Sequence, residues 1–150
     1  MPAPGGGRRH DRRGACAARH LRRCGVKRDH RRAILAKGHV ESIAGTEHAK
    51  AFGAVCMKLP ILVHQAGLAP ALHHVAQLSK TEKREILDHL AAQLREGGLL
   101  PDGTKDELLR HAREANATQL LAATREVQRC LEWYRSFAKT ILKAEPEEDE

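Results

Sequence analysis

Cationic side chains recur at helical spacing near the C-terminus, where they could bind a nucleic-acid backbone. Six residues follow one another at steps of four, three, four, three and four, and four of them are cationic. They are Arg125, Arg129, Glu132, Ser136, Lys139 and Lys143. On a helix these steps form one stripe, with neighbours about 6 Å apart along the axis. Cations at this spacing can follow phosphates without reading bases, so the stripe predicts sequence-independent, salt-sensitive binding.

Three further basic residues are candidates for the same role. Lys50 and Lys58 lie opposite the apolar side of a predicted helix, and Arg135 lies beside the C-terminal stripe. The alternative for all of these residues is an ordinary solvated face, with Glu132 paired to Arg129. The sequence alone leaves both interpretations open.

Metal, cofactor and nucleophile chemistry has weaker support. The densest group of metal-ligating types is Cys16, His20, Cys24 and His30, whose spacing matches no common zinc module. His73 and His74 point about 100° apart on a helix and cannot both ligate one ion comfortably. The sequence contains no phosphate-cradling glycine loop, and none of its three serines lies in a G-x-S-x-G motif. We therefore expect no metal, no cofactor and no enzymatic activity.

The net positive charge of the chain comes from the N-terminal segment. The formal net charge is +7, and residues 1–32 contain 11 Lys/Arg against 2 Asp/Glu, which leaves 15 against 17 for the remainder. This segment combines glycines and Arg-Arg pairs without a hydrophobic period, so we expect a disordered basic arm over residues 1–32. Three explanations fit it: a nucleic-acid-binding arm, an inert extension, and a translation start placed too far upstream. Residues 145–150 form an acidic tail at the other end.

Between these ends, apolar residues recur at helical spacing almost throughout. One predicted helix carries Phe52, Cys56 and Val63 on its apolar side, and Pro60 should kink or break it. Gly67 and the pair Gly97-Gly98 mark helix ends, and Thr104 and Asn116 can cap the helices that follow. We find no alternating strand pattern. Residues 33–144 are therefore predicted to form one all-α domain, a compact bundle of five to seven helices.

The last predicted helix should organise the core of this bundle. Its apolar seam is heptad-like and continues for about six turns. The seam consists of Leu120, Thr124, Val127, Leu131, Tyr134, Ala138 and Ile141. Cys56 and Cys130 fall on apolar faces, where small buried hydrophobic residues are expected.

The surroundings of the protein follow from hydropathy and cysteine usage. No apolar run approaches the roughly 20 residues needed to cross a bilayer. No secretory hydrophobic segment precedes the widely spaced cysteines. We expect a cytoplasmic protein without a membrane partner.

Two separated segments resemble a known family. Residues 58–72, Lys-Leu-Pro-Ile-Leu-Val-His-Gln-Ala-Gly-Leu-Ala-Pro-Ala-Leu, resemble the K-L-P-x-hydrophobic…G-L…A-L segment of the small subunit of the type III-B CRISPR effector, the Cmr complex. Residues 123–127 and 131–139 resemble the closing helix of that family, in the same order. Ala66 departs from the pattern, since a polar residue is expected before the glycine. The resemblance covers roughly residues 33–144 and leaves the arm without a counterpart.

The resemblance implies an all-helical subunit without an active site, acting in antiviral defence. Its partners would be the backbone and large subunits of the effector together with guide and target RNA, and copies could also stack on one another. The implied role for the basic residues is to line the RNA path. They are Lys50, Lys58, Arg125, Arg129, Arg135, Lys139 and Lys143. The alternative function is a free-standing, sequence-independent nucleic-acid-binding protein that acts through its Arg-rich N-terminal arm.

Overall fold

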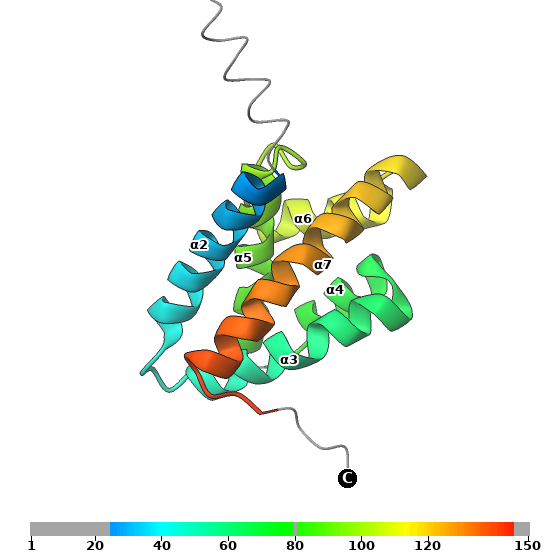
Figure 1. The fold of residues 1–150 in the computed structure, drawn as a ribbon. Helices are drawn as coiled ribbons and strands as arrows, with labels where there is room; N and C mark the ends of the chain where they lie inside the picture. Colours follow the sequence, from blue (N-terminus) through cyan, green and yellow to red (C-terminus); the bar gives the residue numbers. More distant parts are fainter. Residues whose placement is uncertain (1–24, 80, 146–150) are drawn as a thin grey trace, which may run out of the picture.

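The computed structural model describes residues 25–79 and 81–145, and these ranges contain six α-helices and no strand (Figure 1). The helices are α2 (Gly25–Ile43), α3 (Ala49–Ala66), α4 (Leu68–Ala76), α5 (Thr81–Glu96), α6 (Lys105–Glu114) and α7 (Ala117–Thr140). The predicted all-α bundle is confirmed. None of the helices in the described part of the chain is long and apolar enough to cross a membrane.

Helix α7 is the central element of the bundle. It packs most extensively against α2 on one side and α3 on the other, and α5 lies behind it in the view of Figure 1. Val127, Leu131, Tyr134 and Ala138 are all fully buried, as the seam predicts. Burying this apolar stripe, rather than helix propensity alone, stabilises the longest helix.

Local sequence accounts for several helix ends. Asn116 and Gln119 form a capping box at the start of α7: the Asn116 side chain accepts from the Gln119 N–H at 2.9 Å, and the Gln119 side chain accepts from the Asn116 N–H at 3.2 Å. Thr104 accepts from the Glu107 N–H in the same way at the start of α6. Gly67 ends α3 with φ 89°, a backbone conformation that favours glycine. Pro60 lies inside α3, which continues as one helix, so the chain does not break there into two helices.

The predicted boundary between arm and domain, at residue 32, is wrong. Helix α2 begins at Gly25, so residues 25–32 belong to the bundle. Arg32 is buried, and its charge is compensated by the carboxylate of Glu126 instead of by water. Residues 1–24, which contain the rest of the predicted arm, and residues 146–150 of the acidic tail lie outside the described ranges.

Candidate nucleic-acid interface

The C-terminal stripe lies on the solvent-facing side of α7. Its exposed members are Arg125, Arg129, Glu132, Ser136 and Lys139. Within residues 25–79 and 81–145, Arg125, Arg129 and Lys139 have neither an ion pair nor a hydrogen bond. The alternative in which Glu132 neutralises Arg129 is therefore not realised in this part of the chain. Three cations on one rigid helix remain available to bind an anion.

The last member of the predicted stripe does not lie on this helix. Helix α7 ends at Thr140, and Lys143 follows in the left-handed region with φ 53°. This turns the chain back, so that the N–H of Ala144 donates to the carbonyl of Ala138 at 3.0 Å. Lys143 is exposed, but the helical spacing that placed it on the stripe does not apply beyond residue 140.

The other predicted contacts fall in different environments. Lys50 and Lys58 are exposed on α3, the helix that packs against α7. Arg135 is half-buried on α7, and its Nε is enclosed without a hydrogen-bond partner among the described residues. The seven predicted residues are thus distributed over α3, α7 and the turn after α7. Their binding of RNA stays a prediction.

A buried ion pair, which the sequence did not reveal, joins the start of α2 to α7. Arg32 donates from Nε and Nη2 to the two carboxylate oxygens of Glu126, at 2.8 and 2.7 Å. The Arg28 Nη2 approaches Glu126 Oε2 at 3.1 Å and the Gly97 carbonyl oxygen at 3.3 Å. Gln93 of α5 donates to the carbonyl of Arg32 at 3.1 Å. Burial would raise the pKa of Glu126, but the hydrogen bonds from Arg32 and the charges of both arginines outweigh it and lower that pKa.

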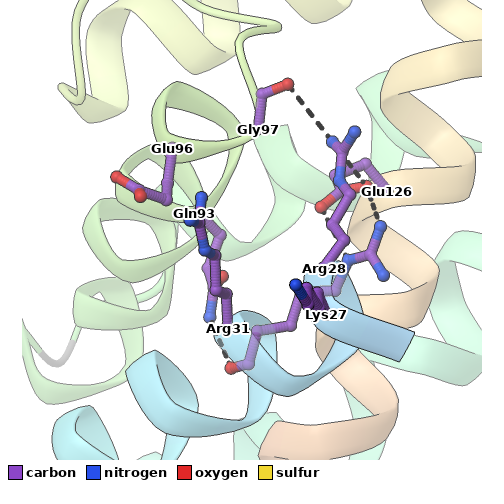
Figure 2. A pocket seen from close by; sticks show the side chains of 8 residues that line it. Lys27, Arg28, Arg31, Gln93, Glu96, Gly97 and Glu126 are labelled. Carbon is purple, nitrogen blue, oxygen red and sulfur yellow. Dashed lines mark hydrogen bonds and ion pairs between the residues drawn. The ribbon is translucent and has the colours of Figure 1, made fainter. Parts of the chain in front are cut away.

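A small pocket opens beside this ion pair. Figure 2 shows side chains of α2, α5 and α7 that converge on it. Its volume is about 180 Å³, and it is lined by Lys27, Arg28, Arg31, Arg32, Gln93, Glu96, Gly97 and Glu126. Four cations and two carboxylates give the lining a surplus of positive charge. We call this feature the α2 basic pocket.

Helical spacing was the signal that could have located the ion pair. Arg32, Ala36 and Val40 recur at intervals of four and are buried, so the buried stripe of α2 continues backwards into the arginine-rich segment. Arginine on such a stripe requires a buried carboxylate partner, and Glu126 lies between apolar positions of the α7 seam.

The thiols and histidines give no further site in the described ranges. Cys56 and Cys130 are buried free cysteines, as expected, and burial raises the pKa of Cys130 to about 12, which makes an activated thiolate unfavourable. No group of three metal-ligating side chains occurs among the described residues. Cys16, His20 and Cys24 lie outside the described ranges.

Comparison with known proteins identifies the family of the chain. The family model of the CRISPR-associated protein Cas_Cmr5 matches residues 28–141. The chain belongs to the Cmr5 family. A related protein, the CRISPR system Cmr subunit Cmr5 of Thermus thermophilus, is 37% identical over 91 residues, which cover 59% of this chain and 73% of that protein. The crystal structure of a Cmr5 family protein from the same organism matches with a TM-score of 0.69 at 33% identity, covering 76% of this chain and 96% of that one.

The extent of the Cmr5 match bears on which cations belong to the family region. It begins at Arg28, so it includes Arg28, Arg32 and Glu126, the residues that join α2 to α7. It ends at Ile141, before Lys143. The resemblance seen in the sequence is confirmed, and the Cmr5 region extends five residues further toward the N-terminus than the predicted domain.

Proposed function

We propose that this Cmr5-family chain is a non-catalytic small subunit of a type III-B CRISPR effector, and that it lines the path of the guide and target RNA. The observation that carries the proposal is the exposed stripe of α7, where Arg125, Arg129 and Lys139 have no partner within the described part of the chain. The relative from Thermus thermophilus is itself a Cmr subunit, which supports placement in such a complex.

The rigidity of α7 suits backbone contact rather than base recognition. Arg125 and Lys139 are 14 residues apart on one helix, a separation of about 21 Å along its axis. Fixed cations over this length can hold several phosphates in register, while pairing with the guide selects the target. Lys50, Lys58, Arg135 and Lys143 would extend the same basic surface.

The proposed assembly also defines the partners. The chain would pack against the backbone and large subunits of the effector and against further copies of itself, in the cytoplasm. Affinity for RNA would come mainly from the assembled groove, so the isolated chain should bind RNA weakly.

The proposal is tested by removing two stripe charges in the reconstituted complex. The affinity for single-stranded RNA falls as salt rises, and each lost phosphate contact should make the slope of log K against log[KCl] shallower by about 0.7. R125Q/R129Q should therefore reduce this slope by about 1.4. The matched control K37Q/R113Q removes one lysine and one arginine from exposed positions on α2 and α6. Target-RNA binding is measured over a series of KCl concentrations. An unchanged slope in R125Q/R129Q complexes of normal composition would contradict the proposal.

The Arg-rich N-terminus favours a second candidate, a free-standing nucleic-acid-binding protein. Residues 1–24 alone contain seven arginines and one acidic residue. Deleting residues 1–24 discriminates the two functions, because the free-standing binder loses nearly all affinity and the subunit loses little within the complex. The deletion must stop before α2, since removing residues 25–32 would also remove Arg32 from Glu126.

A further inference from the structure

The α2 basic pocket contains cationic side chains that the packing of the helices does not use. Lys27 and Arg31 are exposed one turn apart on α2, and neither has a hydrogen bond or ion pair within residues 25–79 and 81–145. Arg28 and Arg32 are neutralised in part by Glu126, and Glu96 is exposed at the C-terminal end of α5. The two unpartnered cations therefore account for the surplus charge of the lining.

We propose that the α2 basic pocket binds one phosphate group of an RNA backbone, with Lys27 and Arg31 as direct ligands and Arg28 as a third donor. This inference rests on the proposed function and adds a contact on a second face of the molecule. None of these three residues belongs to the α7 stripe.

The position of Arg28 is fixed before any ligand arrives. Its Nη2 donates to the Gly97 carbonyl oxygen at 3.3 Å and forms an ion pair with Glu126 Oε2 at 3.1 Å. The side chain is nevertheless 45% exposed, and the N–H groups of Nε and Nη1 remain for a ligand. A preorganised guanidinium loses little side-chain entropy on binding an anion, and its planar fork matches phosphate oxygens.

The size of the pocket limits what it can hold. About 180 Å³ is well below the 300–1,000 Å³ typical of sites for whole small molecules. A single charged group of a longer chain fits this space better than a complete nucleotide.

The position of the pocket favours an RNA phosphate over the carboxylate of a neighbouring protein. Glu126, which lines the pocket, directly follows Arg125 on α7, so the two side chains point about 100° apart around the helix. An RNA strand bound by the α7 stripe would reach the pocket by curving about a quarter turn around α7. A carboxylate from another subunit would need a protein surface at the same place.

The test replaces the two unpartnered cations in the full chain and assembles the complex. K27Q/R31Q should incorporate like the wild type, because neither side chain has a partner within the described part of the bundle. The slope of log K against log[KCl] for target-RNA binding should become shallower by about 0.7. When KCl is lowered from about 1 M to about 0.1 M, the variant should therefore gain about fivefold less affinity than the wild type. K37Q/R113Q, which also removes one lysine and one arginine, should bind like the wild type. Native mass spectrometry reports the composition of each particle.

Three outcomes would overturn the inference. If K27Q/R31Q complexes bind RNA like the wild type while R125Q/R129Q complexes bind more weakly, the pocket is not a phosphate site and the proposed function survives. If neither variant weakens binding, the proposed function fails with it. If folded K27Q/R31Q no longer enters the complex, the occupant of the pocket is an acidic group of a neighbouring subunit.

Discussion

Two stacked histidines between α2 and α5 should make the stability of the fold depend on pH. The rings of His39 and His89 lie 4.2 Å apart between centroids, with planes 13° from parallel. The Tyr134 hydroxyl lies 2.7 Å from Nδ1 of His39 and accepts from Gln93 at 3.3 Å, so it can donate to a neutral His39 ring. Nδ1 of His89 is buried without a partner among the described residues.

Burial makes protonation of this pair unfavourable in the folded state. It lowers the pKa of His89 from 6.5 to about 4, with a smaller contribution from His39, and it also lowers the pKa of His39. Below about pH 6.5 the unfolded chain therefore binds more protons than the folded chain does. The free energy of unfolding decreases as the pH falls from about 6.5 toward the folded pKa of His89, about 4. For His89 alone, the loss between about pH 7 and pH 5 amounts to about 2 kcal/mol.

The variant H89F retains an aromatic ring next to His39 and Phe52 and removes the titrating group. Its free energy of unfolding should fall about 2 kcal/mol less than that of the wild type between about pH 7 and pH 5, measured by urea denaturation. The control H74F makes the same change at an exposed histidine and should keep the wild-type pH dependence. Because the readout is the change with pH, a lower absolute stability of H89F does not obscure the result.

Glu126 should not contribute to the change in stability between about pH 7 and pH 5. The pKa of Glu126 is lowered from 4.5 in the folded state, so its contribution is present above about pH 4.5 and is lost only at lower pH. If wild type and H89F lost stability in parallel down to about pH 5, the inference that His89 is held neutral by burial would be refuted.

Two further substitutions test the packing around α7. Arg32→Met should lower the free energy of unfolding by about 3 kcal/mol, measured by urea denaturation, because it leaves the buried Glu126 carboxylate with only the partly exposed Arg28. The double variant R32M/E126M should recover much of that loss. If both variants lost the same free energy, the unpaired charge of Glu126 would not be the cause. Gly53→Ala should lower the free energy of unfolding by about 1 kcal/mol, because a Cβ there would lie 2.9 Å from the Cβ of Ala144 and this clash should outweigh the gain of about 1 kcal/mol that Ala brings to a helix interior. A higher melting temperature would show that the segment after α7 moves away freely.

Local patterns were sufficient to predict most of the helices. The seam of α7 could be predicted because the same 3.6-residue period that exposes Arg125 and Arg129 buries Val127 and Leu131. The cap at Asn116 could be predicted because both of its partners lie within four residues along the chain. Lys143 was misplaced because the chain reverses after Thr140, and no helical period describes a left-handed residue.

The start of α2 could not be predicted from composition. Composition treats arginines as solvated charges, but the partner of Arg32 lies 94 residues away on α7. The pocket was missed for the same reason, since its lining comes from α2, α5 and α7 and exists only when those helices are packed. The four-residue spacing that leads back from Val40 to Arg32 indicates that α2 continues into this segment, but it does not identify Glu126 as the partner.

The arginine-rich start of α2 shows how one run of charge can serve two purposes. Residues four apart share a face of a helix, so Arg28 and Arg32 both reach Glu126, while Lys27 and Arg31 form a neighbouring pair that faces solvent. The inner pair fixes α2 against α7, and this packing holds the outer pair at a constant position relative to the α7 stripe. A flexible arm with the same charge would attract RNA without holding it in register. Anchoring through Glu126 is therefore what allows these cations to act at a defined place.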